Sequence, residues 1–335
     1  SRATCSGTRV RVESERALVL DGVGRSAALD VATLAAQTVP EVVWIEPQAE
    51  YRPLNLDAVA ITQAGTQNPP QYPIHQMGIH GEGEIIGVGD SGLDVGHCFF
   101  EQATGGTAAE QVPSPTHRKV VNYRAYADGE ATGTRDHGTH VVGSILGESS
   151  TPGALGENEK GAAYKAKVSF TDIGPGNAPG LAVPNDLVNN FFNVDYENGA
   201  RIHSNSWGAN INAYTLPTQD VDEFMHTFDD MLILFAAGNS GQQGPGSIGA
   251  PATCKNCLTV GASENNDPPR ADGNVAVFSS QGPAVGGRIK PDLVAPGFSV
   301  QSANSNSPGD CPITSMAGTS MATPITAGDV ALIRQ

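Results

Sequence analysis

Basic residues are scarce in this sequence. Lysine and arginine together number 19, against 35 aspartate and glutamate residues, and the net charge is -16. A nucleic-acid-binding surface must supply many cations to phosphate groups, so we expect no nucleic-acid partner. The excess of carboxylates leaves two interpretations open, namely solubility or the binding of calcium, which takes oxygen ligands.

Long hydrophobic runs are also missing. No segment approaches the roughly 20 consecutive apolar residues that a membrane-spanning helix needs, so we expect no membrane span. The hydrophobic content of 39% is still enough for a packed core, and 335 residues suffice for one large domain with a small appendage. No signal peptide is recognisable, so a secreted protein would already have lost its targeting segment.

Two regions follow one another along the chain. Residues 1–52 predict a small α+β unit, and residues 53–335 predict an α/β domain with a mostly parallel central sheet and helices on both faces. The amino-terminal unit is predicted from strands at 8–13 and 17–20, a helix at 26–37 and a strand at 41–45. A polar stretch at 48–72 is interpreted as a linker.

The larger region alternates apolar runs of strand length with helical patterns. The predicted strands are 85–90, 167–173, 202–207, 231–237, 258–262 and 293–295. The predicted helices are 138–146, 185–198 and 219–228. An insert at 101–135 is rich in Gly, Thr and charged residues and is interpreted as a surface loop.

Two polar residues are predicted to follow buried strands. Asp90 ends the strand IIGVGD, and Asn239 follows the strand at 231–237 in AAGNSG. Groups at the carboxyl ends of parallel strands lie where α/β proteins bind ligands. Taken singly, Asp90 could also be an ordinary capping residue, and Asn239 could be a turn residue.

Two further polar residues are predicted at helix starts. His137 lies in DHGTHVVG, and Ser320 lies in GTSMATP. A metal site formed by His137 and His140 is disfavoured, because zinc-binding helices of the familiar kind space their histidines four apart. Ser320 could be a simple helix cap, but the small residues around it favour an exposed hydroxyl near backbone N–H groups.

These four motifs together resemble the subtilase family of serine proteases. Their order, Asp then His then Ser, is that of subtilisin. FSSQGP and KPDLVAPG are further matches to the family. The longer stretches RIKPDLVAPG and GTSMATPITAG resemble the oxidatively stable alkaline protease branch. The resemblance covers about residues 53–335 and implies a secreted serine endopeptidase. Structural calcium is implied as well, with ligands unknown.

The resemblance also implies a role for each residue. Ser320 is the nucleophile, His137 moves the proton, Asp90 orients His137, and Asn239 with the Ser320 N–H binds the oxyanion. Two alternatives stay open. The chain could be a zymogen inhibited by its own amino-terminal unit, or a non-catalytic binding protein on the same scaffold.

Substrate binding is implied at three segments. The pocket for the residue before the scissile bond (P1) is predicted from Ser206, Trp207, Gly208, Ala236, Ala237, Gly238 and Gly249, although Trp207 could be plain core. Residues 240–257 contain no Asp or Glu, so a P1 residue that is apolar or uncharged is expected. Protein or peptide substrates are the expected partners.

The five cysteines suggest two disulfides. Cys98 lies eight residues after Asp90, and Cys311 lies nine residues before Ser320. The convergence of the catalytic residues could bring Cys98 and Cys311 within disulfide reach. Cys254 and Cys257 suit a local disulfide or half of a zinc site, and the alternative for all five is a buried reduced thiol.

The two ends of the chain carry further expectations. VVWIEPQAEY at 42–51 resembles the end of a subtilase prodomain, with a stable amino-terminal extension as the alternative. Only 15 residues follow Ser320, fewer than the family usually has. We therefore expect further structure from another chain, a cleaved segment or a longer sequence.

Overall fold

The computed structural model describes residues 9–14, 17–21, 33, 55–65, 70–102, 113–127, 136–150, 160–176, 180–265, 273–305 and 311–335. The chain divides into two compact units, Ser1–Arg52 and Pro53–Gln335. In the smaller unit, β1 (Arg9–Ser14) and β2 (Ala17–Asp21) pair as an antiparallel hairpin. The helix predicted at 26–37 lies outside the described residues apart from Thr33, and the strand predicted at 41–45 lies wholly outside them.

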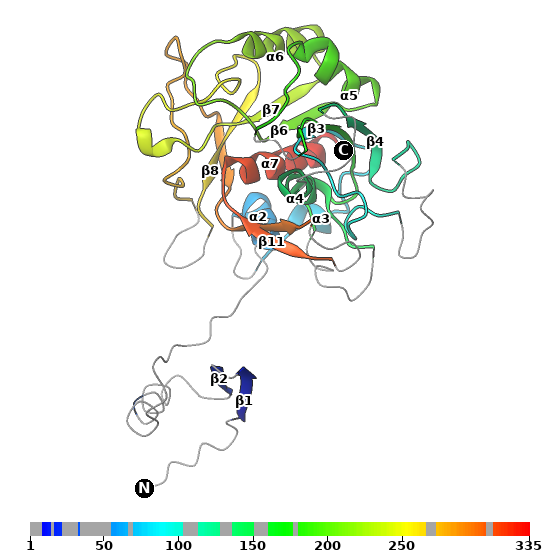
Figure 1. The fold of residues 1–335 in the computed structure, drawn as a ribbon, viewed down its shortest axis with the longest axis vertical. Coiled ribbons are helices and arrows are strands. Elements are labelled where there is room, and N and C mark those ends of the chain that lie inside the picture. Colours follow the sequence, from blue (N-terminus) through cyan, green and yellow to red (C-terminus); the bar gives the residue numbers. More distant parts are fainter. Residues whose placement is uncertain are drawn as a thin grey trace. The chain divides into compact units, whose positions relative to one another are not determined.

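Seven parallel strands form the central sheet of the larger unit, in the order β4-β5-β3-β6-β7-β8-β9 (Figure 1). These strands are mostly buried on both faces, as in parallel sheets covered by helices. The predicted α/β fold is confirmed. The strands are β3 (Ile85–Asp90), β4 (Val120–Ala125), β5 (Lys167–Asp172), β6 (Ile202–Asn205), β7 (Leu232–Ala236), β8 (Leu258–Ser263) and β9 (Leu293–Pro296).

Helices cover both faces of this sheet. Side chains alternate along a strand, so Leu234 packs in the cluster with α4 and α7, and Ile233 packs in the cluster with η1 and α6. Figure 1 shows α7 and α4 on one side of the sheet and α6 on the other. The helices are α2 (Asn55–Ala64), α3 (Pro73–Gln76), α4 (Asp136–Leu146), η1 (Val188–Phe192), α5 (Asn193–Glu197), α6 (Leu216–Thr227), η2 (Gly241–Gln243) and α7 (Thr319–Arg334).

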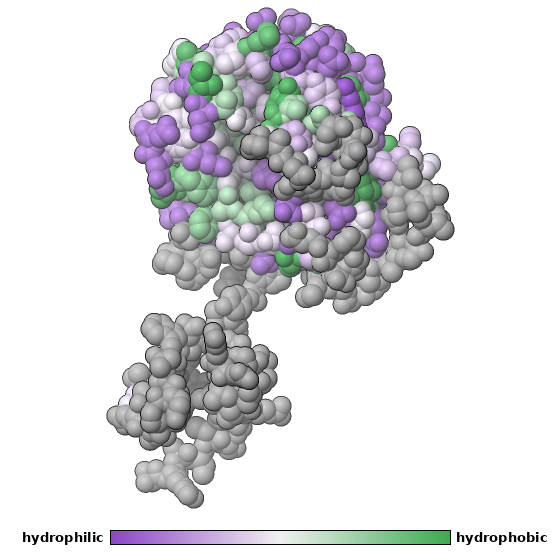
Figure 2. All heavy atoms as spheres, viewed as in Figure 1, coloured by the Kyte–Doolittle hydropathy of each residue, from purple (hydrophilic) through white to green (hydrophobic). Residues whose placement is uncertain are grey.

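Helix α6 illustrates how sequence selects the buried face. Val221 and Phe224 lie three residues apart and are buried, whereas Gln219, Glu223 and His226 are exposed. Figure 2 shows hydrophilic residues gathered over this helix on the visible face. None of the described helices is long and apolar enough to cross a membrane.

The prediction of a surface loop at 101–135 is wrong in part. Strand β4 lies within it and pairs in parallel with β5, which makes β4 an edge strand of the sheet. Val120 and Val121 are buried, but their short apolar run is surrounded by turn-forming residues. The strand is stabilised by pairing with β5, a contact that the local sequence does not reveal.

The linker predicted at 48–72 is also wrong in part, because α2 lies inside it. Its NLDAVAITQA sequence has no clear apolar stripe. The buried residues Ala58, Val59 and Ala60 lie on a helix that packs against α7, β9 and β10. Tertiary packing therefore stabilises a helix that sequence periodicity alone does not predict.

Two other elements differ from prediction. The helix predicted at 185–198 consists of the π-helix η1 followed by α5. An antiparallel hairpin of β10 (Val300–Ala303) and β11 (Ile313–Met316) lies between β9 and α7 and was not predicted. This hairpin leads directly into the helix that carries Ser320.

Candidate active site

The carboxyl ends of three adjacent strands position two candidate catalytic residues, Asp90 and Asn239, and one residue predicted for the P1 pocket, Ser206. Asp90 is the last residue of β3, Ser206 follows β6, and Asn239 lies three residues beyond β7. Because β3, β6 and β7 are neighbours in a parallel sheet, their carboxyl ends lie along one edge. The fold thus gathers residues that are more than a hundred positions apart in sequence.

A short hydrogen bond joins Asp90 to His137. The distance from His137 Nδ1 to Asp90 Oδ1 is 2.8 Å, and Asp90 is only 1% exposed. The backbone N–H of Ser91 donates to the same carboxylate oxygen at 2.7 Å. The carboxylate is therefore fixed, and it holds the imidazole by Nδ1, so that Nε2 is the nitrogen left for chemistry.

Gly138 allows this approach. A Cβ atom added at Gly138 would lie 2.2 Å from the carbonyl oxygen of Gly92, which follows the Asp90 turn. Any other residue would push the start of α4 away from the strand end. The glycine after His137 is therefore required by the close backbone contact, in addition to being part of the sequence motif.

Burial and charge act in opposite directions on His137. Burial lowers the pKa of the imidazole, but the negative charge of Asp90 and its hydrogen bond raise that pKa, and the net pKa lies above the ordinary 6.5. The Asp90 carboxylate therefore favours the imidazolium that forms when His137 accepts a proton. His137 has the environment of a general base.

His140 has a different environment. It is fully buried, and its Nε2 is 2.9 Å from the carbonyl oxygen of Val300. Burial lowers its pKa to about 4, so the ring is neutral at ordinary pH. His140 ties α4 to strand β10.

Ser320 is the second residue of α7, at a helix amino terminus. Its Oγ donates to the carbonyl oxygen of Ser206 at 3.2 Å, and the Ser206 hydroxyl donates back to the carbonyl oxygen of Ser320 at 2.8 Å. In its predicted role the Ser320 hydroxyl would have to turn from this carbonyl toward His137, and hydrogen bonds of catalytic groups are often poorly aligned before substrate binds. The reciprocal pair fixes the start of α7 against the end of β6.

Asn239 is oriented by Thr319. The Oδ1 of Asn239 accepts hydrogen bonds from the backbone N–H of Thr319 at 2.9 Å and from its hydroxyl at 3.0 Å. With the amide oxygen engaged, the Nδ2 group is directed the other way and can donate to a substrate. The Thr319 hydroxyl also accepts from the N–H of Gly238 at 3.2 Å, which joins the two segments.

A cavity of about 300 Å³ adjoins Ser320 and Asn239. Its lining contains all seven residues predicted for the P1 pocket, namely Ser206, Trp207, Gly208, Ala236, Ala237, Gly238 and Gly249. It also contains Ala209, Asn210, Ser240 and Thr319, which were not predicted. Trp207 is half-buried and packs against Phe235 with a ring centroid distance of 5.1 Å, so it contributes to both core and cavity.

Glycines line part of this cavity where two backbone segments approach each other closely. A Cβ atom added at Gly249 would lie 2.5 Å from the carbonyl oxygen of Ala209. The segments are joined there, because the N–H of Ala209 donates to the carbonyl oxygen of Ala250 at 2.8 Å. No Asp or Glu is among the described residues that line the cavity.

The structure pairs four of the five cysteines. Cys98 and Cys311 form one pair with a Cα–Cα distance of 5.2 Å, and Cys254 and Cys257 form another at 5.7 Å. Both distances suit disulfides. Cys5 lies outside the described residues.

Replacing the predicted oxyanion donor tests its role. We expect Asn239→Ala to lower kcat by about 10²–10³-fold with little change in KM, as for the corresponding donor of subtilisin, because the amide acts on charge that develops only in the transition state. Steady-state kinetics on a peptide anilide give the two parameters separately. A change confined to KM would mean that Asn239 is a binding or turn residue.

Comparisons with known proteins agree with this geometry. The sequence profile of the subtilase family matches residues 81–335. Subtilisin Savinase of Lederbergia lenta is 32% identical over 261 residues, covering 78% of this chain and 80% of that protein. The alkaline protease of Alkalihalobacillus alcalophilus is 31% identical over 301 residues, covering 90% of this chain and 66% of that protein.

A larger relative and a solved structure extend the comparison. The serine protease/ABC transporter B family protein tagA of Dictyostelium discoideum is 33% identical over 231 residues, which span 66% of this chain but only 13% of that protein. The structure of sphericase superposes with a TM-score of 0.55 at 26% identity, covering 76% of this chain and 77% of that one. The oxidatively stable branch stays a prediction. The chain belongs to the subtilase family of serine proteases.

Proposed function

We propose that this chain is an endopeptidase in which Ser320, His137 and Asp90 form the catalytic triad. The observation that carries the proposal is the 2.8 Å bond between buried Asp90 and His137, on the sheet edge where Ser320 and Asn239 border the cavity. This arrangement supplies a nucleophile, a base, an orienting group and an oxyanion donor.

The reaction follows from these positions. Ser320 Oγ attacks the carbonyl carbon of the scissile peptide while His137 Nε2 takes the hydroxyl proton. Asn239 Nδ2 and the backbone N–H of Ser320 donate to the resulting oxyanion. His137 then gives the proton to the leaving amine, the C–N bond breaks, and water hydrolyses the acyl-enzyme by the same steps in reverse order.

Labelling with a fluorophosphonate tests this function. The probe phosphonylates an activated serine, so we expect peptide mapping to locate the label on Ser320 and nowhere else. The experiment compares the full chain with protein from which residues 1–52 have been removed. Labelling only after removal supports the zymogen alternative, and absence of label in both samples would indicate a non-catalytic scaffold.

The shape and charge of the cavity support a preference at P1. We expect peptides with Phe, Leu or Met at P1 to be cleaved faster than peptides with Arg or Lys, because the described residues that line the cavity offer a cation no carboxylate partner. Values of kcat/KM on a matched series of peptide anilides measure this preference.

Asn210→Asp is the matched variant for this prediction. It adds a carboxylate to the cavity lining with almost no change in side-chain volume, so we expect it to raise relative cleavage after Arg. A strong preference for Arg in the unsubstituted enzyme would mean that a carboxylate elsewhere in the cleft binds P1.

The location and maturation of the protein are also proposals. Two disulfides at Cys98–Cys311 and Cys254–Cys257 support a secreted enzyme, since such bonds persist in oxidising compartments. The division of the chain at Arg52 supports an amino-terminal unit that is separable from the catalytic unit. Secretion and a prodomain role for residues 1–52 are tested by finding mature enzyme outside the cell without this segment.

A further inference from the structure

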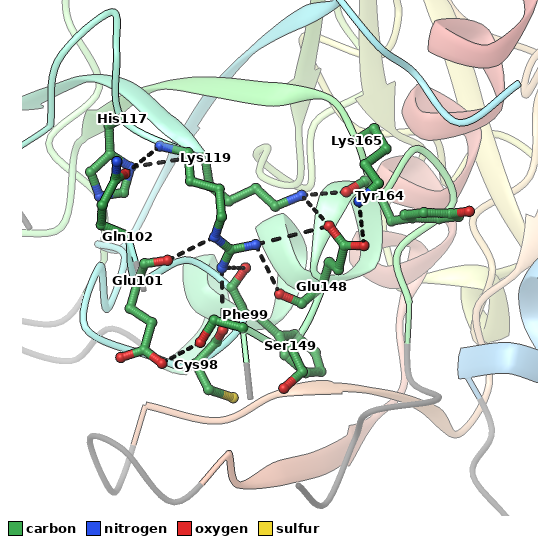
Figure 3. Close-up of polar contacts among 12 residues, drawn as sticks. Cys98, Phe99, Glu101, Gln102, His117, Lys119, Glu148, Ser149, Tyr164 and Lys165 are labelled. Atoms are coloured by element: carbon green, nitrogen blue, oxygen red, sulfur yellow. Dashed lines mark hydrogen bonds and ion pairs between the residues drawn. The ribbon is translucent and has the colours of Figure 1, made fainter. Parts of the chain in front are cut away.

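The guanidinium of Arg118 lies among main-chain carbonyl oxygens from two loops. Its Nε donates to the carbonyl of Glu101 at 2.8 Å, and its Nη2 donates to those of Cys98 and Phe99 at 3.3 and 3.1 Å. Its Nη1 donates to the carbonyl of Glu148 at 3.1 Å (Figure 3). The guanidinium therefore donates hydrogen bonds to four carbonyl oxygens and uses most of its five N–H groups.

Such a group of oxygens is the kind that binds a hard cation. Calcium is held by main-chain carbonyls together with carboxylates, and here the carboxylate of Glu148 lies 3.9 Å from Arg118 Nη1. Four carbonyl dipoles that face one group repel one another unless that group carries a positive charge, and here they face the three nitrogens of the guanidinium. The 2.8–3.3 Å separations are N–H···O distances, so the spacing fits the guanidinium rather than a bare ion.

The charge balance around Glu148 gives a second, independent argument. Its carboxylate lies 2.7 Å from Lys165 Nζ and 3.6 Å from Lys119 Nζ, in addition to Arg118. Lys119 is 2% exposed and also donates to the carbonyl of Tyr164. Arg118, Lys165 and the buried Lys119, whose pKa burial lowers to about 7, already surround this carboxylate. An added divalent ion would therefore meet positive charge instead of an unpaired negative charge.

We propose that Arg118 is a built-in cation that fills a calcium-like site and holds these two loops without bound metal. The family resemblance predicts structural calcium, but at these loops the residues fit a guanidinium instead. Among the described residues, no group of three or more His, Cys, Asp or Glu side chains is placed to hold a metal ion. The inference is independent of the catalytic roles assigned above.

The two loops connect to both halves of the active site. The first follows β3 and carries Cys98, which is paired with Cys311 just ahead of β11. The second follows α4, whose second residue is His137, and the N–H of Ser150 donates to the carbonyl of Cys98 at 3.0 Å. Arg118 thereby joins segments that leave the aspartate strand and the histidine helix.

Hydrogen exchange measured by mass spectrometry tests the proposal locally. The full chain is used in a Ser320→Ala background, which prevents self-digestion. We expect chelation with EDTA to leave the protection of segments 97–101 and 147–150 unchanged. We expect Arg118→Ala to lower that protection about 10- to 100-fold, because hydrogen bonds to a charged group are lost and four carbonyls are left without a cation.

Chemical rescue separates a cation site from simple packing. Millimolar guanidinium chloride is expected to restore most of the protection in Arg118→Ala. Calcium chloride is expected to restore little, because the spacing fits a guanidinium and two lysines remain beside Glu148. Arg124→Ala is the matched control, because Arg124 makes an exposed contact with the carbonyl of Asn190 and should neither affect these segments nor respond to either ion. Arg118→Lys keeps the positive charge but lacks the several N–H donors of the guanidinium, so we expect its hydrogen-exchange protection to be intermediate.

Several outcomes would overturn the proposal. EDTA could reduce the protection of these segments in the parent protein, which would place a metal there. Arg118→Ala could match the Arg124→Ala control, its loss of protection could fail to respond to guanidinium chloride, or calcium chloride could restore the protection as well as guanidinium chloride does. If Arg118→Ala does not fold, its refolding in guanidinium chloride and intermediate protection in Arg118→Lys would support a cation site. Failure of both would indicate that Arg118 contributes only packing.

Discussion

Ser320→Ala is expected to abolish peptide hydrolysis while leaving the fold intact. The triad serine of subtilisin contributes about a million-fold to kcat, because its loss removes the attacking oxygen and the covalent intermediate together. Alanine suits the second position of α7, and among the described residues the side chain loses the hydrogen bond to the Ser206 carbonyl. The measurements are kcat on a peptide anilide and the thermal unfolding midpoint.

A second serine provides the control for this variant. Ser315 lies on β11, five residues before Ser320, and is exposed. Ser315→Ala should retain near-complete activity and full fluorophosphonate labelling. Activity of Ser320→Ala close to the parent level would remove Ser320 from the mechanism.

The candidate catalytic motifs could be predicted because each is contiguous in sequence and because the four together resemble one family, although each alone left another interpretation open. GDSG, DHGTH, AAGNSG and GTSMA each combine a polar group with small residues that permit a tight backbone approach. Gly138 shows the reason, since a side chain there would collide with the carbonyl of Gly92. A requirement for a small residue at a fixed position, as at Gly138, can be recognised in the sequence without knowledge of the fold.

The lining of the cavity was predicted less completely for a physical reason. Ala209 and Asn210 have no chemical signature of their own. They reach the cavity because Ala209 pairs with Ala250, some forty residues later in the chain. Sites formed by backbone pairing between distant segments are visible only in three dimensions.

The Arg118 cluster could not be predicted from sequence either. Its guanidinium partners come from residues 98–101 and from Glu148, so they lie about 20 positions before it and 30 after it. Arg118 is followed by Lys119 in the sequence THRKVV, and arginines in such polar segments are ordinarily exposed. The interpretation of 101–135 as a surface loop missed both β4 and this cation, because each is stabilised by contacts made only after folding.

Asp90→Asn is expected to lower kcat by about 10⁴-fold without disturbing substrate binding. In the parent enzyme the buried carboxylate accepts the Nδ1–H of His137 and the N–H of Ser91. An asparagine amide can donate to Nδ1 instead and so favour the tautomer with its proton on Nε2. That tautomer presents no lone pair to Ser320, the effect known for the triad aspartate of trypsin-like proteases.

The pH profile distinguishes this cause from a loss of structure. A protonated His137 cannot act as a base, so activity falls as pH drops through its pKa, which Asp90 raises above 6.5 against the opposing effect of burial. Without the Asp90 charge, burial still lowers that pKa. The acid limb of kcat/KM for the residual activity should therefore move to lower pH in Asp90→Asn.

Asp172 offers the matched control for this experiment. It ends β5 directly beside Asp90 in the sheet register, is buried, and accepts hydrogen bonds from the Tyr123 hydroxyl and the N–H of Gly174. Asp172→Asn removes a buried charge from the same sheet edge but leaves the contact with His137 in place. We expect its acid limb to stay close to that of the parent and its kcat to fall by far less than that of Asp90→Asn. Equal losses in the two variants would show that any buried carboxylate at this edge supports the fold, and would remove Asp90 from its specific role with His137.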